Sequence, residues 1–364
     1  MRENLESKRF LHRFKSDPWA IGSLSFILLV TLCALFAYTL SLDKTQYANQ
    51  MHLSIHSKPP GFSCRMLLIP GEDQKIKTSI FTGQINADEE IPLSELNWLA
   101  DGFEYKRYGN LTDYFDKITF GQYPGFDSKE AIQTHYLYSK RFLLGTDKYG
   151  RDLLSRLLVG SRISISIGFV AVFISLTLGV FMGALSGFFG GWVDRLILWL
   201  INVVWSIPTL LMVIAITLAL GRGYWQVFVA VGLTMWVEVA RLVRGQVISI
   251  KEQLYIQASF TLGFSKYTIL VGHILPVVVA PLIVISAANF ASAILMESGL
   301  SFLGIGAQPP MPSWGGMVKD HFRYLLLGKP YLALLPGLAI MSLVLAFMML
   351  GNSLRDILDV RNTS

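Results

Sequence analysis

Charged side chains are scarce in this sequence. Asp, Glu, Lys and Arg account for 15% of its 364 residues, whereas 52% of the residues are hydrophobic and the mean hydropathy is +0.48. A chain with so little polar surface cannot cover an apolar core in the way a soluble globule does. The composition therefore predicts a membrane protein.

Cysteine is also rare, and the spacing of metal ligands is missing. Cys33 lies inside the first long apolar run and Cys64 lies beyond it, so we expect no disulfide framework and interpret both thiols as structural. His52 and His56 are one helical turn apart, but no third ligand follows at a suitable spacing. We expect solvated histidines and no metal site.

Motifs for chemistry and for energy coupling are absent from the sequence. It has no GxxxxGK(S/T) phosphate loop, no HExxH, no nucleophile elbow and no carboxylate cluster in the apolar runs, where charged residues occur only at the ends. Ion-coupled carriers usually keep ionisable or unwound coordinating sites at mid-membrane. We therefore expect neither an enzyme nor a cofactor of its own, and an energy source on another chain.

The long apolar runs that are present define the expected fold. Charge-free segments cover 19–42, 163–193, 196–221, 223–237, 274–296 and 330–354. All but the fourth exceed the ~20 residues that a helix needs to cross ~30 Å of hydrocarbon. The prediction is an all-α membrane protein with six transmembrane helices.

Charge placement orients these helices. Five basic residues within 1–18 precede the first run, which by the positive-inside rule puts the N-terminus in the cytoplasm, and six spans then put the C-terminus there too. The uncharged stretch 19–42 is too long for the core of a signal peptide, so a retained anchor helix is expected. The expected organisation is a cytoplasmic N-terminus at 1–18, transmembrane helix 1 at 19–42, an extracytoplasmic loop or domain at 43–160, helices 2–6 within 161–354 with a cytoplasmic loop at 241–275, and a cytoplasmic tail at 355–364.

The long polar segment after the first span is electrically neutral. Residues 43–162 hold 15 basic and 15 acidic residues, so the net charge of +6 belongs to the rest of the chain. Turn signals at Pro59-Pro60-Gly61 and Pro124-Gly125 interrupt the segment. The sequence leaves open whether it is an ordered domain or a set of loops.

One amphipathic stretch between apolar runs has the features of a docking loop. Val247, Ile250, Leu254, Ala258 and Leu262 recur at helical spacing, which predicts a first helix with an apolar side. Gly263 can close that helix, Ser265 can cap a second one, and Pro276 ends the second or marks the start of a span.

This loop carries a recognisable pattern. The residues are Tyr255, Ile256, Gln257, Ala258, Ser259, Phe260, Gly263, Leu275 and Pro276. They resemble the cytoplasmic coupling loop of ABC-importer permeases, whose pattern is Glu-Ala-Ala, then Gly, and later Leu-Pro. Gln257 stands in place of the Glu and Ser259 in place of the second Ala, so the charge of that Glu is missing here. The resemblance implies that this loop receives the force of a separate ATPase.

Two further segments are similar to permeases of the dipeptide/oligopeptide/nickel importer family, C-type inner-membrane subunit. The first, 144–166, carries Gly145, Thr146, Asp147, Gly150, Arg151 and Asp152; the second, 297–317, carries Glu297, Gly304, Gly306, Pro309, Pro310, Trp314 and Gly315. Locally, Asp147 or Thr146 is expected to cap the helix that follows, and Asp152 to pair with Arg151, Arg156 or both. The glycines and prolines of the second segment forbid a continuous helix and predict a re-entrant or interfacial loop.

Polar residues inside the apolar runs are candidates for lining a translocation path. Asn202 and Ser206 interrupt the third run next to Pro208, whereas Ser286, Asn289 and Ser292 recur at three-residue spacing in the fifth. An interhelical hydrogen bond is as good an interpretation of Asn202 as a transport role. At the inner end of the fourth run, Glu238 and Arg241 are spaced to pair with each other.

Taken together, the resemblance implies the ABC type I importer permease fold, six transmembrane helices and a location in a bacterial inner membrane. It implies a second permease subunit, two cytoplasmic ATPases that hold ATP and magnesium, and an extracytoplasmic binding protein that delivers peptide or a related solute such as nickel. No nucleic acid is expected as a partner. A secondary carrier that works alone, or a membrane-anchored sensor whose working part is the outer segment, stays open as an alternative, as does export instead of import.

Overall fold

The computed structural model describes residues 11–71, 77–79, 82–85, 88–110, 114–221 and 223–358. The basic residues Arg2, Lys8 and Arg9, which are among the five used in the orientation argument, lie outside these ranges. The chain divides into two compact units, which are described separately. A helical unit contains the residues up to Thr31, Ser164–Gln308 and those from Gly337; a sheet-bearing unit contains Leu32–Ile163 and Pro309–Pro336.

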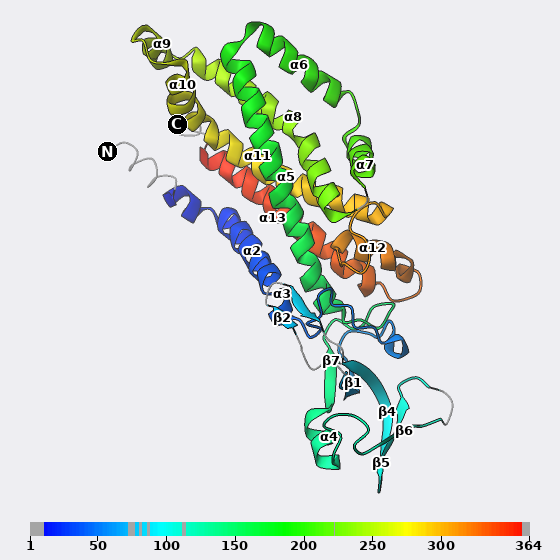
Figure 1. Ribbon diagram of the computed structural model, residues 1–364. Helices are drawn as coiled ribbons and strands as arrows, with labels where there is room; N and C mark the ends of the chain where they lie inside the picture. The colour runs from blue at the N-terminus through cyan, green and yellow to red at the C-terminus, as the bar shows by residue number, and fades with distance from the viewer. Residues whose placement is uncertain are drawn as a thin grey trace. The chain divides into compact units, whose positions relative to one another are not determined.

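Long apolar helices make up the helical unit, and the unit boundaries fall inside three of them (Figure 1). The helices are α2 (Pro18–Leu35), α5 (Leu153–Phe189), α6 (Gly191–Trp205), α7 (Thr209–Leu220), α8 (Tyr224–Lys251), α9 (Leu254–Thr261), α10 (Lys266–Thr268), the π-helical turn η2 (Ile269–Ile274), α11 (Leu275–Leu303) and α13 (Tyr331–Leu358). In the described residues, five helical stretches are long and apolar enough to cross a membrane, or six if α6 and α7 form one span. This supports the predicted helical membrane fold.

The third predicted span is broken in the middle. Helices α6 and α7 meet at an angle of 91° across Ser206, Ile207 and Pro208. Proline lacks the backbone N–H that a continuous helix needs, and it disfavours helical geometry in the residue before it. The polar interruption seen in the sequence is therefore a sharp bend between two half-helices.

The fourth span is longer than the charge-free run 223–237 indicated. Helix α8 continues to Lys251, with 67% of its most apolar window buried against 17–39% for the other four candidate spans. It packs against α7 and α11. Arg241 and Arg244 of α8 contact α6, so the helix continues past charged residues, which is why the charge-free length underestimated it.

Proline 276 does not end a helix. Lys266–Leu303 forms one 38-residue helical stretch, in which Pro276 occupies the first turn of α11 directly after the π-helical turn. A proline is tolerated there because the first turn of a helix has N–H groups without helical partners. Of the two roles predicted for Pro276, the structure supports the start of a span.

The polar segment left open by the sequence contains a β-sheet, so the all-α description holds for the membrane helices only. Five antiparallel strands lie in the order β6-β5-β4-β1-β7, and β2 pairs with β3 separately (Figure 1). The strands are β1 (Phe62–Ile69), β2 (Lys77–Ser79), β3 (Gly83–Ile85), β4 (Glu89–Leu99), β5 (Gly102–Arg107), β6 (Asp116–Thr119) and β7 (Leu137–Phe142). Short helices in the same unit are α3 (Ala37–Leu40), η1 (Leu53–Ile55), α4 (Lys129–His135), α12 (Trp314–His321) and η3 (Phe322–Leu325).

Strand β1 shows why this sheet was hard to predict. Leu67 and Ile69 face one core together with Phe103, whereas Cys64 and Met66 on the opposite face pack in a second cluster with Phe142. A strand that is buried on both faces lacks the alternation of polar and apolar residues that identifies a half-buried strand. Helix α5 begins at Leu153, before the boundary predicted at residues 160 and 161, whereas the division between the two units falls after Ile163.

Candidate functional site: the loop between α8 and α11

The predicted docking loop forms a short helix, α9, that is separate from α8. Helix α8 ends at Lys251, and α9 begins at Leu254 after Glu252 and Gln253. The break changes which residues face inward. Ile256 is fully buried, whereas Leu254 is 87% and Leu262 75% exposed, so the apolar side predicted for one continuous helix is wrong beyond Ile250.

The buried side of α9 fastens the loop to α5. The Phe260 ring stacks on Phe188, near the end of α5, with 6.1 Å between centroids. Ile256 joins the same core, together with Val247, Ile250, Ile269 and Ile274. Full burial of an aliphatic side chain stabilises by about 1.5–3 kcal/mol, so this core fixes the position of α9 relative to α5, α8 and the start of α11.

Polar contacts reinforce the same attachment. The Lys251 ammonium group donates to the Phe188 carbonyl at 2.7 Å, and the Gln257 amide donates to the Lys251 carbonyl at 2.9 Å. The Gln257 side chain, at the position where the related loops have Glu, therefore forms a hydrogen bond within this loop. Ser259 is used locally too, since its hydroxyl donates to the Tyr255 carbonyl at 2.9 Å.

Gly263 ends α9 as predicted. Its φ of +78° lies in the left-handed region, and the Phe264 N–H donates to the Ser259 carbonyl at 3.2 Å, which closes the helix end. An added Cβ would meet open space, so the requirement for glycine here comes from the backbone dihedral alone. Ser265 caps the next helix as predicted, because its hydroxyl accepts from the Thr268 N–H at 3.1 Å.

The outer side of the loop carries large apolar side chains in contact with solvent. These residues, which we call the coupling surface, are Leu254, Tyr255, Leu262, Phe264 and Tyr267, exposed by 87%, 51%, 75%, 48% and 75%. Figure 1 shows α9 and α10 at one end of the helical unit. Exposed apolar side chains gathered on one short loop are typical of a protein-binding surface. The sequence identified Tyr255 but gave Leu254 and Leu262 to the wrong side, and nothing in the predicted pattern singled out Phe264 or Tyr267.

An ion pair and a cation–π contact hold α6 against α8. Arg244 donates to both carboxylate oxygens of Asp194, at 2.6 and 2.8 Å, and Ser186 of α5 also hydrogen-bonds Asp194. Arg241 donates to the side-chain amide oxygen of Asn202 at 3.1 Å and lies 3.5 Å from the centroid of the Trp205 ring. The predicted pair of Glu238 with Arg241 is therefore not formed, because Arg241 turns toward α6 instead.

The first signature segment, 144–152, is buried in the sheet-bearing unit. Asp147, with no exposed surface, pairs with Arg151 at 2.6 Å and lies 3.8 Å from Arg156. Asp152 instead caps α5, since its carboxylate accepts from the Ser155 N–H at 2.8 Å and from the Ser155 hydroxyl at 2.5 Å. The roles predicted for Asp147 and Asp152 are thus exchanged, because Asp152 is the residue directly before the helix.

The turns of this segment need glycine. Gly150 has φ of +75°, and a Cβ there would lie 1.8 Å from the His52 carbonyl oxygen. Gly145 has a positive φ as well, and the Thr146 hydroxyl donates to the Ile55 carbonyl at 2.5 Å. The segment is therefore built into the loop that precedes β1, and its residues act structurally, as the capped-helix interpretation predicts.

The second signature segment has a helical part in each unit. In the helical unit, Glu297 is buried and accepts from the Ser301 hydroxyl at 2.6 Å; Ser301 in turn accepts from the Ala307 N–H at 3.1 Å, and Gly304 ends α11 in the left-handed conformation. Residues 297–303 are thus helical, and the loop predicted over the whole segment is confined to 304–313.

In the sheet-bearing unit, Trp314 meets the first signature segment. Its indole N–H donates to the Leu157 carbonyl at 2.9 Å, and the ring lies against Gly160. Gly315 beside it is buried, Gly306 leaves no room for a Cβ next to Ser301 in the helical unit, and Pro309-Pro310 is joined by a cis peptide bond. The meeting of 157–160 with Trp314 could not be predicted, since the two segments are more than 150 residues apart.

The five residues predicted to line a path do not share one surface. Asn202 is bonded to Arg241, and the hydroxyls of Ser206 and Ser286 donate to carbonyls of their own helical turns, Val203 at 2.7 Å and Leu282 at 2.6 Å. Asn289 is buried, with its amide nitrogen unpaired among the described residues. Ser292 lines a small cavity between α6, α7, α8 and α11.

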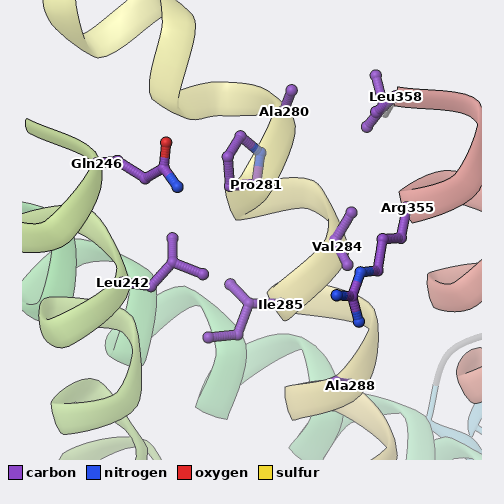
Figure 2. Close-up of a pocket in the computed structure, with 9 residues that line it drawn as sticks. All are labelled: Leu242, Gln246, Ala280, Pro281, Val284, Ile285, Ala288, Arg355 and Leu358. Atoms are coloured by element: carbon purple, nitrogen blue, oxygen red, sulfur yellow. The ribbon is translucent and has the colours of Figure 1, made fainter. Parts of the chain in front are cut away.

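Two hollows follow the contact between α8 and α11. The larger, of about 600 Å³, is lined by Leu242 and Gln246 of α8, by α11 residues from Ala280 to Ala288, and by Arg355 and Leu358 of α13. Figure 2 shows Leu242 and Ile285 pointing toward each other and Arg355 reaching in from the opposite side. The smaller, of about 60 Å³, is lined by residues of α6 to α8 and α11, including Glu238 and Ser292.

The histidine prediction is wrong in one respect. His52 is buried and lies 3.3 Å from the Glu90 carboxylate, which also accepts from Lys140 at 2.6 Å. Burial raises the pKa of Glu90, but the contacts with His52, Lys140 and the Tyr138 hydroxyl outweigh it and hold the pKa at about 2. Among the described residues, no group of three His, Cys, Asp or Glu side chains could hold a metal ion.

Comparison with known proteins finds relatives over more than half of the chain. The chain is 40% identical over 216 residues to a glutathione transport system permease protein of Pectobacterium atrosepticum, covering 59% of this chain and 71% of that one. It is 40% identical over 220 residues to a dipeptide transport system permease protein of Alkalihalophilus pseudofirmus, covering 60% and 72%. A solved chain of the MetNI methionine ABC transporter, in an inward-facing conformation, superposes with a TM-score of 0.46 and 18% identity over 55% of this chain and 95% of that one.

Two family profiles match the chain itself. Residues 7–60 match the N-terminal transmembrane domain of oligopeptide transport permease C. Residues 175–364, just over half of the chain, match the inner membrane component of binding-protein-dependent transport systems. This second match includes the coupling surface, both hollows and every helix from α6 onward. The chain therefore belongs to the family of binding-protein-dependent transport system inner membrane components.

Proposed function

We propose that this chain is the permease subunit of an ATP-driven transporter that moves peptides or peptide-like solutes across a bacterial inner membrane. The observation that carries the proposal is the coupling surface: large apolar side chains exposed on a loop whose underside is firmly packed. The named relatives transport glutathione and dipeptides, which supports a peptide-class cargo.

The proposed partners follow from the same surface. A cytoplasmic ATPase that holds ATP and magnesium covers the coupling surface, and a second permease brings a second ATPase. An extracytoplasmic binding protein delivers the cargo. In this arrangement both termini and α9 face the cytoplasm.

The packing beneath the coupling surface suggests how force would travel. A push on Tyr255 or Leu254 is transmitted through Ile256 and Phe260 to Phe188 of α5, and through Lys251 to the end of α8. Because α9 is tied to several spans, its displacement moves them together as a rigid group. The bend between α6 and α7 is a place where the helices beyond this group can change their angle.

Replacing Gly263 tests the proposal. Gly263→Val forces a β-branched residue into a left-handed backbone, which distorts the end of α9 without a clash. With the chain assembled with its ATPases and binding protein in vesicles, we expect ATP hydrolysis to continue while cargo uptake falls at least about tenfold, the loss that 1.4 kcal/mol of coupling energy gives. The matched control is Gly272→Val, at an exposed glycine in the same loop with open space and no positive φ.

Normal uptake by the Gly263→Val transporter, with normal dependence on ATP, would contradict the proposed role of the loop. Uptake by the chain alone, without any ATPase, would instead favour a secondary carrier. Labelling of single cysteines introduced at 254 and 267 in intact cells gives an independent check: a reagent that cannot cross the membrane should leave them unmodified.

A further inference from the structure

Glu238 lies inside a membrane-length helix. It is the fifteenth residue of α8, which starts at the aromatic pair Tyr224 and Trp225 and ends at Lys251. At 1.5 Å per residue, Glu238 is about 21 Å along the helix from Tyr224, which is less than the ~30 Å thickness of the hydrocarbon layer. The charge-free run ends at Val237, but α8 continues for 13 residues beyond Glu238, so this carboxylate lies in the middle of the helix and not at its end. An acidic residue at that depth is costly unless a cation or polar groups compensate it.

Glu238 forms no ion pair within the described part of the chain. The nearest basic residue along α8, Arg241, is engaged by Asn202 at 3.1 Å and by the Trp205 ring at 3.5 Å. No ion pair of Glu238 occurs with any described residue, and its side chain is exposed and not packed. The carboxylate is thus left to interact with something outside the fold.

Glu238 lines the smaller hollow, whose chemistry is mixed. Hydroxyls come from Thr209, Thr234 and Ser292, and the remaining wall is Val204, Trp205, Met212, Met235, Val237 and Met296. The hydroxyl of Thr234 is already bonded to the Val231 carbonyl at 2.8 Å. One carboxylate beside hydroxyls, polarisable sulfurs and an aromatic ring is a combination that suits an organic ammonium group.

The size of the hollow limits what can enter it. Its volume of about 60 Å³ is roughly twice the ~30 Å³ that a water molecule occupies in the liquid. An ammonium group and the carbon that bears it fit, whereas a whole peptide does not. A cargo molecule would therefore place only its amino end there.

The rest of such a cargo has a surface to follow. On α8, Glu238, Leu242 and Gln246 are four residues apart and share one side of the helix. On α11, Ile285, Ala288 and Ser292 are three and four residues apart and also share one side. These two rows lead from the small hollow to the large one of about 600 Å³, where Arg355 supplies a positive charge (Figure 2). A solute with an amino group at one end could thus contact residues of both hollows.

We infer that Glu238 is a cargo-contact residue that binds the amino group of a peptide-class solute during its passage. This inference rests on the proposed transport function and adds the chemical group that the path selects. It assigns Ser292 and Thr209 as neighbouring hydrogen-bonding groups. It also accounts for a carboxylate in the middle of α8 that has no ion pair among the described residues.

The test compares two cargoes in two transporters. ATP-driven uptake of a dipeptide and of its N-acetylated form, which lacks the ammonium charge, is measured in vesicles with the complete transporter, for the natural chain and for Glu238→Gln. Any selection by the binding protein affects both transporters equally and cancels in the ratio. We expect Glu238→Gln to reduce uptake of the free dipeptide at least about tenfold more than uptake of the acetylated form.

The control is Glu130→Gln, at an exposed carboxylate on α4 of the sheet-bearing unit, which should change neither uptake rate. An equal effect of Glu238→Gln on both cargoes, or no effect, overturns the inference. It indicates that Glu238 contacts another subunit or has a structural role. If Glu238→Gln does not reach the membrane, Ser292→Lys is used in its place. The ammonium group of the introduced lysine should occupy the hollow and remove the preference for the free dipeptide over the acetylated one. A retained preference overturns the inference. Absence of ATP-driven uptake in the natural transporter would instead defeat the proposed function itself.

Discussion

Two segments of this chain, the first signature segment and the loop between α8 and α11, treat their side chains in opposite ways. In 144–156, the charged residues Asp147, Arg151 and Arg156 are buried and satisfy one another inside the sheet-bearing unit. In 254–267, the apolar residues Leu254, Leu262 and Tyr267 are exposed, although burial would stabilise the chain. Charge is inside and apolar surface is outside, which is the reverse of what each unit alone would favour.

The difference teaches how to separate structural from interacting signature residues. A buried ion pair costs desolvation energy and is stable only if every partner remains, so its residues constrain one another. An exposed apolar side chain has no such constraint from its own chain, and its energetic gain comes when another surface covers it. The first segment thus holds the fold together, and the second awaits a partner.

The largest effect is expected from breaking the buried network. Asp147→Ala leaves Arg151 and Arg156 buried without their carboxylate and should lower the free energy of unfolding by about 3–5 kcal/mol. Thermal unfolding of the purified chain in detergent measures the loss. The matched control is Asp116→Ala, which removes an ion pair to Arg107 that is largely exposed and should cost less than about 1 kcal/mol. Equal losses in the two variants would show that the buried network has no special weight.

Two adjacent residues of α9 sharpen the comparison. Ile256→Ala empties a fully buried site and should destabilise the chain by about 2–5 kcal/mol, whereas Tyr255→Ala should leave thermal unfolding unchanged within about 0.5 kcal/mol. Tyr255→Ala should instead weaken binding of the ATPase, by up to about 30-fold for a 2 kcal/mol contact. Pull-down titration measures the second effect. A Tyr255→Ala chain that unfolds early but binds the ATPase normally would reverse the assignment of inside and outside.

The smallest of these effects is an acid sensitivity of the sheet-bearing unit. The pKa of Glu90 is about 2 in the folded chain against 4.5 ordinarily, so the carboxylate favours the fold above pH 4.5 and loses that contribution as the pH falls toward 2. Between pH 5 and pH 3 the loss should be about 2 kcal/mol, at 1.36 kcal/mol per pKa unit. Glu90→Gln should be less stable at pH 7 and should show a flatter pH dependence in the same unfolding measurement. An unchanged pH profile in Glu90→Gln would mean that other carboxylates set the acid sensitivity.

Local patterns predicted the helices and their ends well, because these depend on residues close in sequence. The apolar runs located the spans, Pro208 located the bend, and Gly263 and Ser265 were placed correctly at the end of one helix and the start of the next. Predictions failed where a short break changed the helical phase: the two residues between α8 and α9 turned Leu254 outward and Ile256 inward. The prediction of side-chain partners failed as well, because Arg241 hydrogen-bonds Asn202 and does not pair with Glu238.

The sequence by itself determined the membrane helices, through length and hydropathy, and the resemblance to permeases, through motif spacing. It also contains no recognisable phosphate-binding loop. Tertiary structure alone decided which side chains meet: Trp314 with Leu157, His52 with Glu90, and Phe260 with Phe188. It also decided that Glu238 lines a hollow between α6, α7, α8 and α11. The physical reason is that burial and pairing are set by packing between distant segments, which residue order near each site does not encode.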